Sequence, residues 1–573
     1  MNQPTPAIVA QSAVRRLPRV ALLLLCAAYL MPGLLGRGPW KSADIAAFGF
    51  MAELAKGGGG IARWLDPMLL GLRPETPALL PYWIGAWAIK IAPAWINPDL
   101  AVRIAFALLL AGVFTATWYA AYYLARTPRA QPVAFAFGGE ARPADYARAL
   151  ADAGLLALVA CLGLAQLSHE TTPDVLRLAA TAAMLLGAAR LSYPGLPHPW
   201  RGLAWWTAGW LALALSGSAG LGLLLGAGWL GLLWLGPRPT PTEAPGDNGR
   251  ALLGVTTAVG VLIALGSGWA GALGPADAPQ ALARLPLDSW GRLLLWFTWP
   301  AWPLVLWTLW RWRRQWRQAH VALPLWAALV VVVHSALAPE RDRALLLALP
   351  ALAVLAAFAL PTLRRSVSSL IDWFTLIFFS FCALVIWVIW FAMMTGVPAK
   401  PAANVARLAP GFVPEFSFLL FALGAAATLA WLWLVSWRVG RHREAIWKSL
   451  VLPAAGSTLC WLLLMTLWLP LLDFGRSYGP ISRRIADLVP ANSCVLADGL
   501  SQAQIAALRH HGNLRLVRTG DAHGADCRSL IATPQSQGSL HQRVNLTQWA
   551  FKANVWRLND SKESLVLYLR VGG

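Results

Sequence analysis

The chain has 573 residues, of which 58% are hydrophobic and 13% are charged, and its formal net charge is +21. A soluble protein of this length cannot hide so much apolar surface, so the composition excludes that class. The positive charge falls mainly in short clusters between apolar runs, which is the pattern of membrane topology and not of nucleic-acid binding. We therefore expect a polytopic membrane protein that contacts membrane lipids and has no nucleic-acid partner.

Apolar runs of membrane-spanning length predict an all-α domain of about thirteen transmembrane helices over residues 1–472. The first run follows Arg15, Arg16 and Arg19, and it is either a cleaved signal peptide or an uncleaved helix. The long preceding segment and the poor cleavage site at Gly36-Arg37-Gly38 favour the uncleaved helix. The predicted spans are 19–36, 101–125, 149–167, 175–193, 203–217, 219–235, 251–270, 289–309, 321–338, 344–361, 369–396, 414–436 and 450–471.

Basic clusters such as Arg311 to Arg314 follow the even-numbered spans, which places them and the N-terminus in the cytoplasm. We therefore expect a bacterial inner-membrane protein whose odd-numbered spans lead to the periplasm. The first periplasmic loop, 37–100, is rich in Trp, Phe and Leu and is predicted to form amphipathic helices on the membrane surface. Within it, 77–95 is predicted to be surface-lying or re-entrant.

Residues 473–573 have the composition of a small periplasmic α/β domain. Strands are predicted at 494–498, 514–518 and 527–533, a helix at 501–511, and a terminal hairpin over 549–571. Cys494 and Cys527 would lie in an oxidising compartment, where a disulfide would join two strands. The sequence leaves this disulfide and two free thiols equally open.

Two acids from different loops are expected on the same periplasmic face. Asp44 follows the first span, and it is either a general base, a metal ligand or a solvated loop acid. Asp174 opens the fourth span, where an acid is also favoured by the helix dipole. Their shared face favours a joint catalytic role, whereas His169 and Glu170 beside Asp174 also fit a plain surface turn.

Arg341 and Arg343 lie at a predicted periplasmic helix end, against the usual charge bias. They form either a self-neutralising turn with neighbouring acids or a clamp for a lipid-linked phosphate, which the arginine fork suits. No convincing Walker, GxGxxG, HExxH or Ser-His-Asp pattern occurs, so no nucleotide cofactor is expected. A periplasmic enzyme without nucleotide sugars must draw on a lipid-linked donor.

Short motifs resemble a known family. The first loop reads Pro39-Trp40-Lys41-Ser42-Ala43-Asp44, followed by Glu75-Thr76-Pro77-Ala78-Leu79-Leu80-Pro81-Tyr82-Trp83. Asp174, the turn from Pro339 and the linker from Asp473 to Tyr478 complete the pattern. The chain resembles the glycosyltransferase C superfamily, in particular bacterial relatives of lipid A aminoarabinose transferase and protein O-mannosyltransferases.

The resemblance implies a glycosyltransferase that moves a sugar from a polyprenyl-phosphate donor to a lipid or glycan acceptor. Asp44 and Asp174 would be catalytic, with a divalent cation such as Mg²⁺ or Mn²⁺ as their candidate cofactor. The residues expected to bind substrate are Lys41, Glu75, Tyr82, His169, Arg341 and Arg343.

Two departures from the family pattern leave alternatives open. Ala43 replaces the aspartate of the family's Asp-Glu pair, and Thr76 replaces the lysine of its Glu-Lys-Pro motif. The alternatives are a non-catalytic relative that acts as a membrane scaffold or assembly factor, and a transporter. The gathering of charged residues near the ends of the apolar runs disfavours transport.

Overall fold

The computed structural model describes most of the membrane domain and of the C-terminal domain. The described residues are 5–40, 42–58, 60–193, 198–235, 286–439, 445–491, 493–520, 526–557 and 560–571. The predicted span at 251–270 and Lys41 therefore lie outside the described residues.

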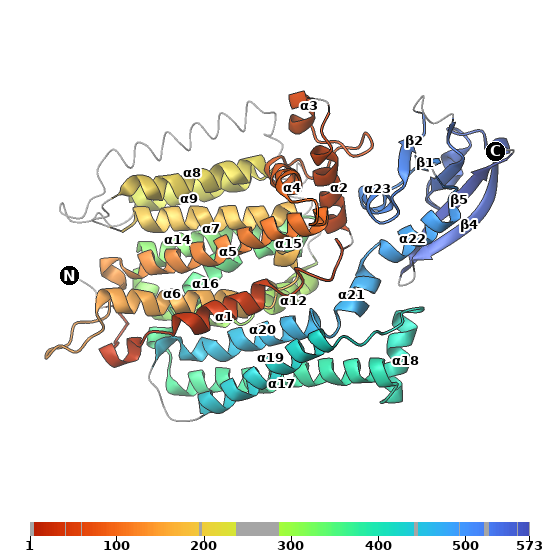
Figure 1. Ribbon diagram of the computed structural model, residues 1–573. Helices are drawn as coiled ribbons and strands as arrows, with labels where there is room; N and C mark the ends of the chain where they lie inside the picture. The colour runs from red at the N-terminus through yellow and green to blue at the C-terminus, as the bar shows by residue number, and fades with distance from the viewer. Residues whose placement is uncertain are drawn as a thin grey trace.

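Apolar helices run side by side in a bundle, and the C-terminal domain is attached at one end of it (Figure 1). The bundle helices are α1 (Arg19–Leu30), α5 (Pro98–Ala125), α6 (Pro143–Ala160), α7 (Pro173–Leu191), α8 (Pro199–Leu215), α9 (Ala219–Leu235), α12 (Leu287–Phe297), α13 (Ala301–Arg311), α14 (Ala319–Leu337), α15 (Arg341–Leu346), α16 (Leu349–Ala357), α17 (Arg365–Thr395), α19 (Phe418–Val439) and α20 (Val451–Leu464).

Six helical segments of the described chain are long and apolar enough to cross a membrane, or seven if one bent pair counts as a span. The chain is therefore a multi-pass membrane protein. Other predicted spans correspond to helices that are shorter or more polar, namely α1, α6, α7, α8 and α9. The predicted span at 289–309 is the bent pair: α12 and α13 meet at 88°. Proline interrupts it at Pro300, because a proline inside a helix removes a backbone hydrogen bond.

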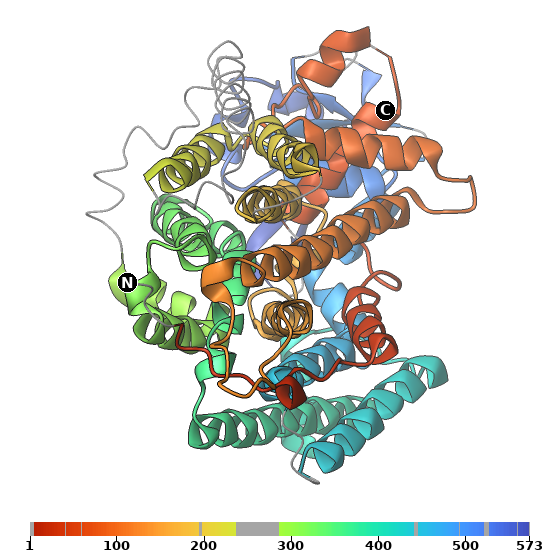
Figure 2. The ribbon, with the colours of Figure 1, turned by 90° about the vertical axis from the view of Figure 1, so that its left-hand side faces the viewer.

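Small residues allow the central helices to approach closely. A side chain at Gly187 of α7 would begin 2.6 Å from the backbone nitrogen of Trp206 on α8. At Gly209 of α8 it would begin 2.6 Å from the carbonyl oxygen of Ala180. Such close backbone contact is a main source of helix association in membranes. Viewed along the bundle, α17 and α19 form one edge, where they pack on α20 (Figure 2).

Shorter helices occupy the end of the bundle that carries the C-terminal domain (Figure 1). They are α2 (Ala43–Ala55), α3 (Gly60–Leu65), α4 (Leu80–Ile91), α18 (Ala399–Leu408), α21 (Leu469–Arg476) and α22 (Gly479–Leu488). The first loop was predicted to form amphipathic helices on the membrane surface, but α2 differs from this prediction. It lacks the solvent-exposed face that an amphipathic surface helix needs. Its buried residues, including Ile45, Phe48 and Met51, lie on all sides because α4 and the C-terminal domain cover it.

The C-terminal domain is a five-stranded mixed sheet of order β2-β1-β3-β5-β4. Its elements are β1 (Cys494–Asp498), α23 (Gln502–His510), β2 (Arg515–Arg518), β3 (Ser529–Ala532), α24 (Gln537–Leu540), β4 (Trp549–Arg557) and β5 (Asp560–Arg570). β1 pairs in parallel with β2 and β3, and β5 pairs antiparallel with β3 and β4. Ser501 caps α23 in a capping box, as its sequence pattern predicts. Cys494 and Cys527 are joined in a disulfide with Cα atoms 4.7 Å apart.

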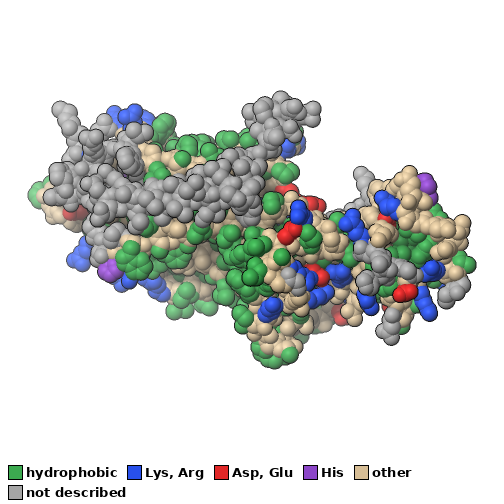
Figure 3. All heavy atoms as spheres, turned by 90° about the horizontal axis from the view of Figure 1, so that it is seen from above, with side chains coloured by type: hydrophobic (Ala, Val, Ile, Leu, Met, Phe, Trp, Pro, Cys, Tyr) green, Lys and Arg blue, Asp and Glu red, His purple; other side chains and the backbone are tan. Residues whose placement is uncertain are grey.

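The C-terminal domain packs directly on α2. A Cβ added at Gly49 would lie only 2.5 Å from Cβ of Ala506 on α23, and the ring centres of Phe48 and His510 are 4.6 Å apart. Arg509 of α23 also pairs with Glu53 at 3.0 Å. In the view from above, charged side chains gather where the two domains meet, and hydrophobic side chains form patches on the described part of the bundle (Figure 3).

Candidate active site

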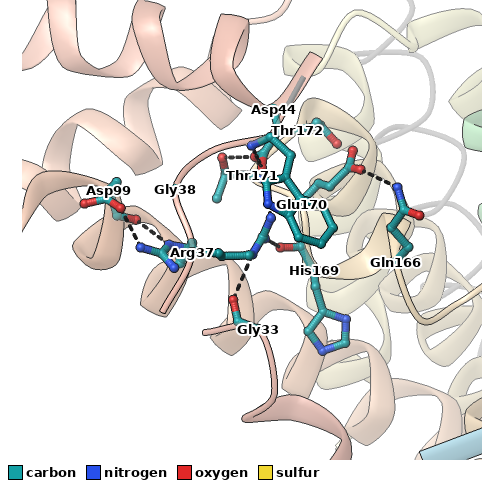
Figure 4. A network of polar contacts seen from close by, with 12 residues as sticks. Gly33, Arg37, Gly38, Asp44, Asp99, Gln166, His169, Glu170, Thr171 and Thr172 are labelled. Carbon is teal, nitrogen blue, oxygen red and sulfur yellow. Dashed lines mark hydrogen bonds and ion pairs between the residues drawn. The ribbon is translucent and has the colours of Figure 1, made fainter. Parts of the chain in front are cut away.

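Asp44 lies in the first turn of α2, where the helix dipole favours an acid, and its side chain is 1% exposed. One carboxylate oxygen accepts hydrogen bonds from the backbone N–H of Thr171 at 2.7 Å and from its hydroxyl at 2.6 Å. The other accepts from the backbone N–H of Trp40 at 3.0 Å and from Arg37 at 3.3 Å. A carboxylate has about four lone-pair positions, so these donors occupy all of them (Figure 4).

Arg37 fixes this carboxylate from the loop that precedes it. Its guanidinium also donates to the carbonyl oxygens of Gly33, at 2.8 Å, and His169, and it lies 4.7 Å from the centre of the Trp40 ring. The residue is 6% exposed, so its charge depends on these partners and not on water. Arg37 therefore ties the first loop to the turn before α7.

That turn carries Glu170, Thr172 and Asp174, all of which reach Arg343 of α15. Arg343 pairs with Glu170 at 2.5 Å and with Asp174 at 3.7 Å, and it donates to the Thr172 hydroxyl at 3.3 Å. Its Nε lies 3.0 Å from Glu340. Because Thr171 binds Asp44 within the same turn, Asp44 and Asp174 belong to one connected network at one end of the bundle.

Burial shapes the chemistry of this network. Glu170 is 2% exposed, and burial raises its pKa; Arg343 opposes that shift, and the nearby charge of Asp44 adds to it. Asp174 is more open, with 13% of its side chain exposed, and it pairs with Arg177 at 2.9 Å. Its carboxylate therefore keeps acceptor positions that no donor from the described part of the chain fills.

The second predicted motif reaches the same network. Tyr82 of α4 is 3% exposed, and burial raises its pKa; Asp174 and Glu75 raise it further, whereas Arg177 opposes the shift. Glu75 is exposed, and its charge also contributes to a raised pKa at Glu340. The charges of Asp174 and Glu75 therefore both act on the Tyr82 hydroxyl.

The predicted arginine pair divides into two environments. Arg343 is held by carboxylates, whereas Arg341 is half-buried and has no ion-pair or hydrogen-bond partner among the residues that the structure describes. Its Nε is buried and unpaired. Arg341 is therefore the arginine of this pair whose guanidinium is open to a ligand.

His169 is placed differently from its predicted substrate-binding role. Its ring contacts the carbonyl oxygens of Ala165 and Tyr29, and the Trp461 ring is centred 4.7 Å away. Burial lowers its pKa to about 4. The side chain packs inside the bundle, and only its backbone carbonyl joins the network, through Arg37.

The linker motif from Asp473 to Tyr478 also contacts the first loop. One oxygen of Asp473 accepts hydrogen bonds from the backbone of Gly38 and from the indole N–H of Trp40, both at 3.0 Å. Trp40 also forms a β-bridge with Ser477, and the guanidinium of Arg476 lies 5.3 Å from its ring centre. Two motifs more than 400 residues apart in the sequence therefore form one structural unit.

A metal does not fit the described arrangement. Among the residues with described positions, no group of three or more His, Cys, Asp or Glu side chains could hold one. Asp44 has no free oxygen position, and the charges of Arg177 and Arg343 beside Asp174 disfavour a further cation there. We therefore derive no step through a metal.

Sequence reasoning missed several members of the network. The position of Arg37, two residues before the Pro-Trp motif, could have indicated a role in the site. Glu170 could have been found in the same way, because it lies in the same turn as Asp174. Asp473 belongs to a motif that was noticed, but nothing in its spacing indicates a contact with Trp40. Arg177, one turn after Asp174, follows the i,i+3 rule for helix ion pairs.

The fold and the network define a multi-pass membrane protein with a buried carboxylate–arginine centre beneath a small mixed-sheet domain. The chain has the fold of ArnT from Cupriavidus metallidurans. The structure of that protein bound to undecaprenyl phosphate matches with a TM-score of 0.61 at 15% identity, covering 97% of each chain. Its apo structure matches with a TM-score of 0.56 at 15% identity, covering 96% of each chain.

No protein-family model matches the sequence, and no curated protein matches it either. At this low identity the structural match establishes the fold alone. It confirms the resemblance found in the sequence at the level of the fold.

Proposed function

We propose that the protein is an inner-membrane glycosyltransferase that moves a sugar from a polyprenyl-phosphate donor to a lipid or glycan acceptor. The observation that carries this proposal is the match over 97% of the chain to a fold that was solved with undecaprenyl phosphate bound. The carboxylate–arginine network supports it, because such transfer needs a proton acceptor and a cation near the leaving phosphate.

The network suggests how the two carboxylates divide the work. An acceptor hydroxyl attacks the anomeric carbon of the donor sugar, and the bond from that carbon to the phosphate oxygen breaks. We assign Asp174 as the group that takes the hydroxyl proton, because its carboxylate is accessible. Asp44, with every lone pair engaged, holds the first loop against the Thr171 turn.

The electron pair of the broken bond leaves with the polyprenyl phosphate. Arg341 is assigned to this phosphate, because its guanidinium has no protein counter-ion among the described residues. Arg343 keeps Glu170 and Asp174 in place. We assign Glu75 and Tyr82 to the sugar, because the charges of Glu75 and Asp174 both act on the Tyr82 hydroxyl.

We propose that the network faces the periplasm. The predicted cytoplasmic basic segments support this orientation, because they gather at the opposite end of the bundle. The indole N–H of Trp447 donates to the carbonyl oxygen of Arg15 at 2.7 Å, and Arg16 pairs with Asp145, so three such segments meet there. This distribution is the one that the positive-inside rule requires. A disulfide in the C-terminal domain also suits the periplasm.

Native mass spectrometry of the purified full chain tests the lipid assignment. We expect a co-purified or added polyprenyl phosphate to remain bound, and Arg341→Gln to weaken this binding about tenfold, the usual effect of losing a charge-assisted hydrogen bond. Arg364→Gln is the matched control, since this exposed arginine precedes α17 at the opposite end. Equal retention of lipid by both variants would contradict the assignment.

A non-catalytic scaffold is the second candidate, and the saturated carboxylate of Asp44 favours it, together with Ala43 and Thr76. This alternative predicts lipid binding without turnover. A sugar-transfer assay with added chelator tests the expected divalent cation. The arrangement predicts that the chelator leaves transfer unchanged, and loss of transfer would restore a metal role for Asp44 and Asp174.

A further inference from the structure

A stripe of exposed residues runs along α5, a helix long and apolar enough to cross a membrane. The helix ends on the side of the bundle away from the C-terminal domain (Figure 1). The exposed positions recur every three or four residues, which places them on one helix face. They are Ile104, Leu108, Gly112, Thr115 and Tyr119.

This stripe suits the hydrocarbon chain of a lipid. A Cβ added at Gly112 would meet no atom within 4 Å, so the stripe is open at its centre. The hydroxyl of Thr115 already donates to the carbonyl oxygen of Ala111 at 2.9 Å and needs no water. From Gly112 to Tyr122 the helix rises about 15 Å, which is half of the roughly 30 Å bilayer core.

A cluster of tyrosines and arginines ends the stripe. Tyr122 and Arg126 continue it by three and then four positions, and Arg126 is the C-cap of α5. The guanidinium of Arg126 donates to the hydroxyls of Tyr122 at 3.3 Å and Tyr193 at 2.8 Å. On the neighbouring helix α7, the guanidinium carbon of Arg190 lies 4.9 Å from the centre of the Tyr123 ring. The rings of Tyr123 and Tyr193 are centred 6.3 Å apart, so both arginines belong to one cluster.

Neither arginine of this cluster is paired with an acid. Arg126 contacts tyrosines, and Arg190 has no hydrogen bond or ion pair within the described residues. Asp145, an acid of the following segment, is already paired with Arg16 and Arg148. The cluster therefore carries two half-buried cations that no described carboxylate neutralises.

Asp152 approaches the cluster but does not balance it. Its carboxylate accepts a hydrogen bond at 2.7 Å from the indole N–H of Trp118, whose ring stacks on Tyr122. Asp152 is 5% exposed, and the cations that act on it are Arg19 and Arg148.

The tyrosine hydroxyls add hydrogen-bond donors to the two cations. A phenol that accepts a hydrogen bond from arginine still has its own proton to donate. Neither Tyr122 nor Tyr193 donates this proton to an acceptor in the described part of the chain. A guanidinium held against a ring face keeps the N–H groups of its edge for an anion, and its fork fits a phosphate.

We infer that this end of α5 is a binding site for an anionic phospholipid. Arg126, Arg190 and Tyr193 hold the headgroup phosphate, and an acyl chain lies along the exposed stripe. The phosphate of a bilayer lipid lies just outside the hydrocarbon core, which is the depth of the residue that follows the span. The inference does not depend on the proposed transfer, since the cluster shares no residue with the network around Asp174.

Native mass spectrometry of the full chain, delipidated in detergent, tests this site by titration with dioleoyl phosphatidylglycerol or dioleoyl phosphatidylcholine. We expect the first phosphatidylglycerol to bind at least about tenfold more tightly than phosphatidylcholine. Arg126→Gln should weaken its binding about tenfold, because a charge-assisted hydrogen bond is lost. Arg129→Gln is the matched control, because Arg129 is exposed and lies outside the stripe and the cluster. Tyr193→Phe keeps the ring beside Arg126 but removes a hydroxyl, and it should weaken binding several-fold.

Thermal unfolding separates a lipid site from a merely structural role of Arg126. Phosphatidylglycerol should raise the Tm of the wild type and of Arg129→Gln, because it binds the folded state, and should raise that of Arg126→Gln less. An equal rise in both variants, or equal affinity of the wild type for the two phospholipids, would overturn the inference. Displacement of phosphatidylglycerol by a lower concentration of polyprenyl phosphate would overturn it as well, whether or not sugar transfer is observed.

Discussion

The coupling between Asp44 and Thr171 tests whether the two loops are joined as the structure shows. In Asp44→Asn one carboxylate oxygen becomes an NH₂ group. This group faces hydrogen-bond donors, but it cannot accept hydrogen bonds from them. If the amide oxygen stays with Thr171, then Arg37 and the backbone of Trp40 lose their acceptor. Breaking a buried ion pair in this way costs about 3–5 kcal/mol, because the side chain of Arg37 is 2% exposed.

Thr171→Val removes only the hydroxyl bond of 2.6 Å to Asp44 and should cost about 1.5–3 kcal/mol. Each single variant loses the hydrogen bond between Asp44 and Thr171, but the double variant loses it only once. The double variant should therefore be less destabilised than the sum of the two single variants, by a coupling free energy of about 1–2 kcal/mol. The measurement is equilibrium unfolding in mixed micelles titrated with SDS, followed by circular dichroism. Thr181→Val is the control, since its hydroxyl donates within its own helix to Arg177, and its effect should add to that of Asp44→Asn. A coupling below about 0.5 kcal/mol between Asp44 and Thr171 would refute the joined loops.

Three further outcomes follow from burial and contact. Arg343→Gln should lower stability by about 3–5 kcal/mol, because it leaves the buried carboxylate of Glu170 without its cation; a Tm within error of wild type would contradict this. Gly49→Leu should separate the domains, since even a Cβ added at this position would lie only 2.5 Å from Cβ of Ala506. Limited proteolysis should then cleave faster between the domains, and an unchanged cleavage rate would argue against this packing. Burial lowers the pKa of His511 from 6.5 to about 4, so the folded state favours the neutral ring. The stability that comes from the neutral ring is therefore complete above pH 6.5 and is lost as the pH falls toward 4. The Tm should therefore drop on acidification, and less so in His511→Gln; equal drops in both would contradict the sign.

The sequence predicted the elements well wherever a single strong periodicity was present. The run after Asn97 became α5, and the pattern from Cys494 to Asp498 became β1 with the same limits. The prediction of one helix over 289–309 was wrong, because the hydrophobicity of this run does not reveal the break at Pro300. The amphipathic prediction also failed at α2, since its second apolar face is buried by a domain about 450 residues further along the chain.

The candidate site shows the same division between local and long-range information. Asp44 and Asp174 were placed at one end of the bundle by topology alone, and the structure joins them through Thr171 and Arg343. Their different accessibility could not be predicted, because it depends on hydrogen bonds between loops that are distant in the sequence. The contact of Asp473 with the first loop is of this kind as well.

The sugar-transfer centre that we propose is built from Asp174 and Arg341, with Asp44 as its structural anchor. The most direct test is transfer of a radiolabelled sugar from synthetic polyprenyl-phosphate donors to membrane extracts by the purified full chain. We predict transfer by the wild type, a fall of at least about 100-fold in kcat for Asp174→Asn measured well below the Tm of that variant, and a raised KM for the donor in Arg341→Gln. Full activity in Asp174→Asn would contradict the account.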